Sequence, residues 1–367
     1  MASHQAYLTG SLLAQPAVQA TRIVAAARLD ACVDALKGLD TDSADALHDL
    51  RVSLRRLRSW LRAFRPYVDD TVRRRRLRKL RRLVRATNGA RDREVWIAWI
   101  SEQSDLPVRA RQGARYVADC LTTESASLND DAVSRVQRRL PKTIDALRRE
   151  FETYSLHVGD DRGRRDPTMA IATAQVVCDG YARLRQRIEA IESEHDIPGI
   201  HQTRIAAKKL RYVVETLDPR PAVAEVTRAL IELQDALGAA RDLQLLVDRL
   251  LDEIASAGGA DARRKAEAAL DILQSEDEHA APRGAIVGLT ELARRARRRA
   301  HEQFETFAAA WYGPQLDTVG SLVSGIADEL ETLPSVLFDA SDQRIERIVA
   351  VSDDSAESAR SEAVPKS

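Results

Sequence analysis

Hydrophobic residues recur along most of this chain at the three- and four-residue spacing that is typical of amphipathic α-helices. In the first half the spacing predicts helices at 12–36, 44–65, 69–85, from 92 onward, 108–127 and 132–155. In the second half it predicts helices at 168–194, 200–217, 222–237, 242–257, 262–275, 283–310 and 316–333. Apolar residues do not alternate with polar ones, as they do in half-buried strands. We therefore expect an all-α fold of antiparallel helical bundles.

One predicted helix, residues 48–65, carries a cationic stripe beside its apolar seam. The seam consists of Leu47, Leu50, Leu54, Leu57 and Leu61. The stripe consists of His48, Arg51, Arg55, Arg58 and Arg62, which fall within an arc of roughly 80°. Ordinary amphipathic helices alternate charge signs on the wet face, whereas this face is only positive after Asp49. The stripe therefore indicates a polyanionic partner.

The same arrangement returns in the second half of the chain. HQTRIAAKKLRY, which starts at His201, repeats the spacing of the segment that starts at His48. Two further pairs of segments match in the same order: NGARD at 88–92 with LGAARD at 237–242, and REFETY at 149–154 with EQFETF at 302–307. Three matched pairs predict an internal duplication.

The duplication predicts two structural halves, which a chain of 367 residues can accommodate. We expect one four-helix bundle in residues 1–157 and another in 168–314, joined by the polar segment HVGDDRGRRDP. The last part, 315–367, would hold one extra helix and a Ser- and acid-rich tail with the composition of a disordered segment.

The charge of the chain is segregated, although its formal net value is zero. Residues 51–95 contain 17 Lys or Arg against 4 Asp or Glu. Compensating acids are found elsewhere, notably between 248 and 278 and near the C-terminus. A local field of this kind attracts a polyanion more effectively than a uniform charge would.

The remaining composition favours a cytoplasmic protein. Cys32, Cys120 and Cys178 are isolated and indicate small buried residues in a reducing compartment. No Lys or Arg precedes Arg22 and Pro16 interrupts the first apolar stretch, so a secretory signal is not expected. No run approaches the roughly 18 apolar residues that span a bilayer, so no membrane partner is expected.

Several further side chains could contact phosphate groups. Arginine grips phosphate oxygens in pairs through its planar fork. Further candidates are Arg78 and Arg82 on the wet side of the second basic helix, and Arg91 and Arg241 in the repeated Gly-Ala-Arg-Asp motif. The aspartates of that motif have the positions of helix caps. Tyr212 could donate its hydroxyl to phosphate or pack in the core.

The repeated histidine has a functional and a structural interpretation. A single histidine beside an apolar seam is usually structural, but His48 and His201 precede the same cation spacing in both halves. We therefore interpret them as donors to phosphate, with the imidazolium form favoured beside a polyanion. Affinity should then rise as pH falls from about 8 to 6, and the rise should vanish in a double alanine variant.

HDLRVSLRRLR at 48–58 and HQTRIAAKKLRY at 201–212 resemble the CHAD family of histidine-containing helical domains. The resemblance covers roughly residues 10–312. It implies two four-helix bundles about a pseudo-two-fold axis, a basic groove between them, inorganic polyphosphate as ligand and, for some members, polyphosphate granules. By position, the implied contacts are His48, Arg51, Arg55, Arg56 and Arg58, and His201, Arg204, Lys208, Lys209 and Arg211. Many relatives add a triphosphate tunnel domain, but its Glu-x-Glu-x-Lys segment is absent here.

Three other functions remain as alternatives. A nucleic-acid binder would use the same cations, but aromatics make up only 4% of the chain and the basic faces carry few Asn or Gln. A phosphohydrolase would need a nucleophile or a metal-binding carboxylate cluster, and no such motif is evident. A helical scaffold would not explain the duplication. We expect no enzyme activity, no cofactor and no bound metal.

The two cationic stripes are unequal, because Glu215 stands where the first half has Arg62. The first half should therefore dominate binding. Charge reversal of Arg51, Arg55 and Arg58 should weaken binding more than reversal of Arg204, Lys208 and Arg211.

Overall fold

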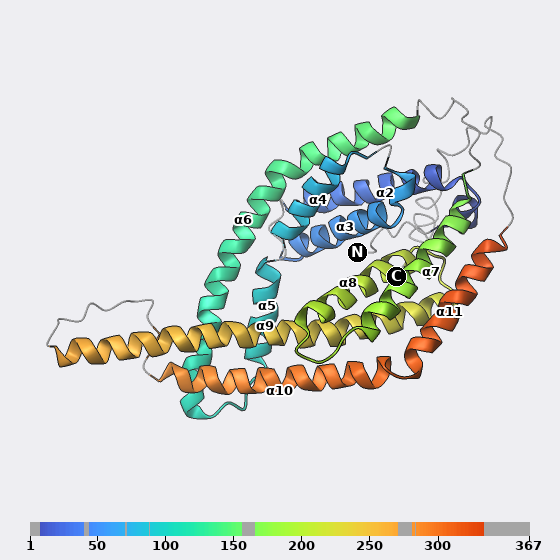
Figure 1. Ribbon diagram of the computed structural model, residues 1–367. Helices are drawn as coiled ribbons and strands as arrows, with labels where there is room; N and C mark the ends of the chain where they lie inside the picture. The colour runs from blue at the N-terminus through green and yellow to red at the C-terminus, as the bar shows by residue number, and fades with distance from the viewer. Residues whose placement is uncertain are drawn as a thin grey trace, which may run out of the picture. The chain divides into compact units, whose positions relative to one another are not determined.

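The computed structural model describes residues 8–39, 44–69, 72–87, 89–155, 166–270, 281–282 and 284–333, which form a succession of helices (Figure 1). The first half contains α1 (Gly10–Leu13), α2 (Ala17–Gly38), α3 (Ala44–Ala63), the short 3-10 helix η2 (Arg65–Tyr67), α4 (Arg74–Ala86), α5 (Gly89–Ser101) and α6 (Val108–Ser155). The second half contains α7 (Met169–Glu189), α8 (Ile197–Val214), α9 (Pro221–Ala269), α10 (Ala285–Trp311) and α11 (Pro314–Glu331). Within these ranges the chain forms no strand beyond isolated bridges. The all-α prediction is confirmed.

The prediction of two helices between 108 and 155 is wrong, because α6 is continuous from Val108 to Ser155. A break was expected near Asn129, where α6 lies against α5. The Asn129 Nδ2 atom donates to Glu94 Oε1 at 3.2 Å. Leu128 lies over Gly89, where a β-carbon would be 3.7 Å from Leu128 Cδ1. These tertiary contacts outweigh the weak helix propensity of Asn and Asp in this segment.

The three helices predicted between 222 and 275 are likewise one helix, α9, from Pro221 to Ala269. It passes through Gly238 and Gly258 without a break, although glycine costs roughly 1 kcal/mol in a helix interior. Burial offsets this cost, since Leu237, Leu243 and Leu246 are each at most 6% exposed. Residues 271–275 of the last predicted helix lie outside the described residues.

Several helices start a few residues from their predicted positions. α2 begins directly after Pro16 instead of at Leu12, and α4 begins at Arg74 instead of 69. α5 begins at Gly89 and includes the whole Gly-Ala-Arg-Asp motif. The predicted tail beyond residue 333 lies outside the described residues.

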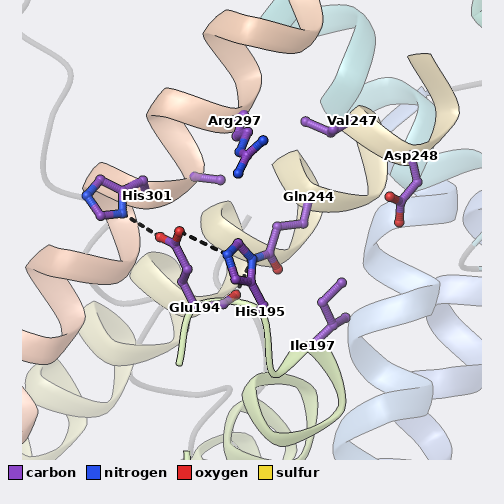
Figure 2. A pocket seen from close by; sticks show the side chains of 9 residues that line it. Glu194, His195, Ile197, Gln244, Val247, Asp248, Arg297 and His301 are labelled. Carbon is purple, nitrogen blue, oxygen red and sulfur yellow. Dashed lines mark hydrogen bonds and ion pairs between the residues drawn. The ribbon is translucent and has the colours of Figure 1, made fainter. Parts of the chain in front are cut away.

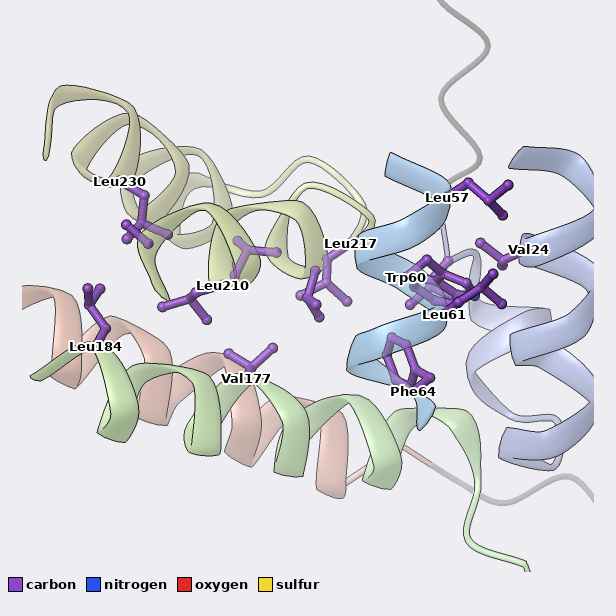
Figure 3. Close-up of a cluster of buried hydrophobic side chains, with 14 of the residues drawn as sticks. Val24, Leu57, Trp60, Leu61, Phe64, Val177, Leu184, Leu210, Leu217 and Leu230 are labelled. Atoms are coloured by element: carbon purple, nitrogen blue, oxygen red, sulfur yellow. The ribbon is translucent and has the colours of Figure 1, made fainter. Parts of the chain in front are cut away.

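The apolar seam of α3 is confirmed as part of the larger of two hydrophobic cores. Leu50, Leu54, Leu57 and Leu61 are each 0% exposed, and Leu47 is 8% exposed. Figure 3 shows this core, where side chains of α3 lie against α2 and those of α8 against α7. The smaller core joins α5, the start of α6, the second part of α9 and the start of α10.

Both cores contain side chains from both predicted halves. The larger core includes Leu57 and Leu210, and the smaller core includes Trp96 and Leu246. The starts of α2 and α7 also exchange backbone hydrogen bonds: Ala17 N donates to Pro167 O at 2.9 Å, and Met169 N donates to Gln15 O at 2.8 Å. Apolar contacts thus join the two predicted halves. The division into two halves stays a prediction, as does the internal duplication.

The backbones of α6 and α10 approach each other closely at a point where both helices present glycine. A β-carbon on Gly113 would lie 2.2 Å from Ala285 O, and one on Gly288 would lie 2.2 Å from Ala110 O. The obstacle is backbone on both sides, so neither clash can be relieved by a side-chain rotation. This crossing fixes the separation of the two helices in the smaller core.

Gly113→Ala is therefore expected to lower the free energy of unfolding by about 1–3 kcal/mol, because the helices must move apart. Urea denaturation followed by circular dichroism measures the change. Gly325→Ala is the matched control, since nothing lies within 4 Å of a β-carbon on Gly325 of α11. That control should be neutral or stabilising by up to about 1 kcal/mol, and equal losses in both variants would contradict the tight crossing.

Candidate basic binding site

The cationic stripe of α3 begins with an arginine that is part of the protein interior. Arg51 is 5% exposed, and its Nη1 atom donates to the backbone oxygen of Thr87, just after α4, at 3.3 Å. Its Nη2 atom lies 3.9 Å from Glu94 Oε2. Burial lowers the pKa of the Arg51 guanidinium, and Glu94 acts in the opposite direction. Arg51 thus ties α3 to the α4–α5 junction.

Arg204 has the equivalent place in α8 and lies on the backbone of α9. Its Nε atom donates to the backbone oxygen of Gln234 at 3.3 Å. Gly238 makes this approach possible, because a β-carbon there would lie 2.8 Å from Arg204 Nε. The predicted helix 222–237 ends just before Gly238. In the structure α9 continues through Gly238, which leaves space for the Arg204 side chain.

Cations of the two predicted halves meet around Lys208, where α3 and α8 pack together. Burial lowers the pKa of Lys208 to about 7, assisted by the positive charges of Arg204, Arg55 and Arg91. The pKa of Arg204 is lowered by burial and by Arg91, Arg241 and Arg55, although Asp242 opposes them. We call this set the central cluster; it consists of Arg51, Arg55, Arg91, His201, Arg204, Lys208, Arg211 and Arg241. Cations of the two stripes thus act on one another, and a groove between them stays a prediction.

The two repeated histidines have different surroundings. His201 is half-buried in the first turns of α8, and its Nδ1 atom is buried without a hydrogen-bond partner among the described residues. Burial and the charges of Arg241, Arg204 and Lys208 lower the pKa of His201. The imidazole is therefore neutral at pH 7 in the free protein. His48 is exposed, so the sequence equivalence of the histidines does not extend to their environments.

A second group of cations continues from the central cluster along α3 and includes Lys209 of α8. Burial lowers the pKa of Lys209 to about 8, with contributions from Arg62, Arg183, Arg58 and Arg187. The pKa of Arg58 is lowered by burial and by Arg62, Arg81 and Arg85. We call this set the lateral cluster; it consists of Arg58, Arg62, Arg81, Arg85, Arg183, Arg187 and Lys209. Helices α3, α4, α7 and α8 each contribute to it.

Four arginines of the lateral cluster were not among the sequence candidates: Arg81, Arg85, Arg183 and Arg187. Their spacing in the sequence is a signal of function. Arg81 and Arg85 of α4 are four residues apart, as are Arg183 and Arg187 of α7, and like charges at this spacing destabilise an isolated helix. Arg78 and Arg82 of α4 were chosen instead. Both are exposed, and neither is among the groups whose charges lower the pKa of Arg58.

Arg56 and Tyr212 belong to neither cluster. The charge of Arg56 acts on Arg28 of α2, whose pKa is lowered to about 10, mainly by burial. Tyr212 is 8% exposed, and the Arg211 guanidinium lies 5.1 Å from its ring centre. The position of Tyr212 favours the packing alternative over a hydroxyl that contacts a ligand.

Acidic side chains balance part of the positive charge. Burial and the neighbouring Asp242 raise the pKa of Asp92, whereas Arg241 and Arg91 lower it. Arg241 Nη1 donates to Asp242 Oδ1 at 3.3 Å, and Arg211 Nε lies 3.3 Å from Glu215 Oε1. The two Arg-Asp pairs of the repeated motif therefore lie near each other. The cations of the two clusters nevertheless outnumber these acids.

A pocket of about 220 Å³ lies between α9 and α10, beside the turn that precedes α8 (Figure 2). The Glu194 carboxylate lies between two imidazoles: it contacts His301 Nδ1, and its Oε1 is 3.5 Å from His195 Nε2. The hydrogen bond to Glu194 raises the pKa of His301. Gln244 of α9 also donates to the Glu194 backbone oxygen. The sequence does not predict this cluster, because its members lie on separate segments.

Other sequence expectations concern metals, cysteines and membranes. Among the described residues, no group of three or more His, Cys, Asp and Glu side chains is arranged to hold a metal ion. Cys32 is buried, but the prediction that all three cysteines are buried is wrong, because Cys178 is exposed on α7. No helix within the described ranges combines the length and the apolar character required to cross a bilayer.

The fold and the two clusters define an all-helical protein in which cationic side chains of several helices lie close together. The CHAD domain family model matches residues 24–250, so the chain belongs to the CHAD domain family, which is associated in general with polyphosphate binding. The crystal structure of the CHAD domain from the plant Ricinus communis is similar, with a TM-score of 0.58 and 20% sequence identity over 88% of this chain and 96% of that chain. At this identity the likeness concerns the fold. None of the curated proteins matches the sequence.

Proposed function

We propose that this protein binds inorganic polyphosphate along the central and lateral clusters without hydrolysing it. One observation carries the proposal: Lys208 lies buried among like charges from both predicted halves, and burial together with those charges lowers its pKa to about 7. A fold that maintains such repulsion in the free protein gains stability when an anion neutralises it. The general association of the family with polyphosphate supports the same ligand.

A polymeric anion suits this surface better than a single phosphate. Cations one helical turn apart on α3 and α8 are spaced by about 5 Å along each axis, which is comparable with the spacing of anionic groups on an extended phosphate chain. The lateral cluster continues the central cluster along α3, from Arg55 to Arg58 and Arg62, so one chain can contact both. The proposed contacts are Arg55, Arg91, His201, Arg204, Lys208 and Arg241, followed by Arg58, Arg62 and Lys209.

Binding without hydrolysis is the activity that the chemistry of the site supports. Phosphoryl transfer requires a positioned nucleophile, usually with a metal ion that neutralises charge. Two acids near the central cluster are paired with arginine: Asp242 with Arg241 and Glu215 with Arg211. In a cell, binding of this kind would place the protein on polyphosphate granules in the cytoplasm.

A titration with three polyanions tests the proposal. Long-chain polyphosphate, duplex DNA and single-stranded RNA are each titrated at about 50 mM and 200 mM salt, while released phosphate is measured. We expect polyphosphate to bind at least about tenfold more tightly than either nucleic acid, with affinity that falls steeply with salt and with no release of phosphate.

Each other outcome of that titration counts against a defined part of the proposal. Equal or tighter binding of DNA or RNA would favour the nucleic-acid alternative. Phosphate release that depends on protein concentration would favour a phosphohydrolase. Absence of binding at low salt would contradict the function altogether.

A further inference from the structure

A larger pocket, of about 410 Å³, lies among α5, α9 and α10, away from Lys208. These three helices surround the smaller hydrophobic core, and their arrangement can be followed in Figure 1. The side chains that matter for its chemistry are Trp96, Trp99, Glu102, Arg298, Arg299 and Glu302. The pocket falls within the usual size range of small-molecule sites, about 300–1,000 Å³.

The pocket wall from α5 is aromatic. Trp96 is 7% exposed, and its Nε1 atom donates to the backbone oxygen of Asp242 at 2.8 Å, which fixes the ring. Trp99 is only half-buried and packs against the smaller core. By contrast, Trp60 and Trp311 are at most 2% exposed in the larger core. Trp99 therefore offers an indole surface to a ligand.

The arginines that α10 contributes to the pocket differ in whether they pair with acidic side chains. Arg295 is paired with Glu291 at 3.0 Å and also contacts Asp105. Arg299 lies 3.0 Å from Glu302 Oε2. Arg298 is exposed and forms no hydrogen bond or ion pair with the residues that the structure describes. Its guanidinium is thus available for an anionic group at the mouth of the pocket.

Carboxylates distinguish this pocket from the two basic clusters. Glu102 and Glu302 line it beside the arginines, and they would repel a bare phosphate chain. Carboxylates do, however, accept hydrogen bonds from sugar hydroxyls, as in ribose recognition. An aromatic surface, a hydroxyl acceptor and an arginine together match the base, the ribose and the phosphate of one nucleotide.

We propose that this pocket binds a mononucleotide, with the base against Trp99, the ribose near Glu102 or Glu302, and the phosphate at Arg298. The site goes beyond the polyphosphate function and does not depend on it. Asp242 lines the pocket and also bonds to Arg241 of the central cluster.

Equilibrium dialysis of the full chain with radiolabelled AMP tests this site, with tryptophan fluorescence as a second readout. We expect saturable binding with a Kd below about 1 mM and quenching of the indole emission. Adenosine should bind at least about tenfold more weakly, because it lacks the charged contact with Arg298. Inorganic triphosphate should neither quench the emission nor displace AMP.

Variants separate the contacts within the pocket. Trp99→Leu should weaken AMP binding at least about tenfold, and Arg298→Gln should weaken AMP but leave adenosine unchanged. Arg294→Gln is the matched control, since Arg294 is an exposed arginine of α10 that pairs with Glu291 and does not line the pocket. Lys208→Glu should reduce polyphosphate binding and leave AMP binding intact, so the two sites can fail independently.

Three results would overturn the nucleotide site. The first is no AMP binding at about 5 mM, well above the expected Kd. The second is AMP binding that neither Trp99→Leu nor Arg298→Gln changes, in variants whose circular dichroism matches that of the parent. The third is binding of single-stranded RNA through these residues with none of AMP, which would assign the pocket to nucleic acid instead.

Discussion

Combined reversal of Arg55 and Lys208 to glutamate is expected to weaken polyphosphate binding by about 100-fold or more at low salt. The two side chains come from different halves, and the charge of Arg55 acts on Lys208 in the folded protein. Each lost charge-assisted contact is worth about 1.5–3 kcal/mol, and the new carboxylates would also repel the ligand. Isothermal titration at about 50 mM salt measures the loss.

The control is Arg263→Glu with Lys265→Glu, which changes net charge equally on exposed side chains near the end of α9. These two side chains are 81% and 77% exposed, and they should matter little to affinity. The variant with Arg55→Glu and Lys208→Glu should be at least as stable as the parent, because these two changes remove repulsion from the central cluster. Equal weakening in both double variants would show that overall charge, and not this cluster, determines binding.

Comparison of the single variants Arg55→Glu and Lys208→Glu examines whether the first half dominates binding. The triple reversals suggested by the sequence are less suitable. Arg51 is buried and bonded to Thr87, so its reversal would destabilise the fold, and Arg211 is already paired with Glu215. A larger loss for Arg55→Glu would support the asymmetry.

Polyphosphate affinity is also expected to rise about 100-fold as pH falls from 9 to 7. In the free protein the pKa of Lys208 is about 7 and that of Lys209 about 8, both below the ordinary value for lysine of about 10.4. A bound polyanion favours the protonated amines, so binding takes up protons throughout this range. Protonation of His201 and Asp92 at lower pH acts in the same direction. Titrations in buffers of different ionisation enthalpy measure the proton uptake.

Lys208→Arg with Lys209→Arg is the decisive control, because arginine stays charged and should flatten the profile between pH 9 and 7. If a double alanine variant of His48 and His201 removes the pH dependence instead, the original histidine hypothesis is correct. The stability of the free protein should change in the opposite sense. Since the unfolded lysines bind more protons above pH 7, unfolding becomes less favourable as pH rises towards 10.

The sequence was a reliable guide where the information is local. The apolar seam of α3 follows from helical spacing, and its leucines are buried as expected. The repeated cation spacing identified Arg55, Arg204 and Lys208, which the fold brings together. Helix ends marked by proline were also predictable, since α3 ends at Ala63, shortly before Pro66.

Features that depend on distant contacts were not predictable. The continuity of α9 at Gly238 depends on Arg204, which approaches from another helix. The contribution of Arg183 and Arg187 depends on how α7 packs beside α8. The Glu194–His301 contact likewise joins segments with no shared motif. In each case the deciding neighbour lies far away in the sequence.

The unbroken course of α9 also bears on how a ligand arrives. A helix of 49 residues is about 74 Å long, and this one contributes to both cores and carries Gln234, Gly238 and Arg241 beside the cationic side chains. Hinge opening between the two cores would require this helix to break at a buried position. Association should therefore proceed as a single bimolecular step on a rigid receptor, with a rate constant set by diffusion and ionic strength and not by a preceding rearrangement.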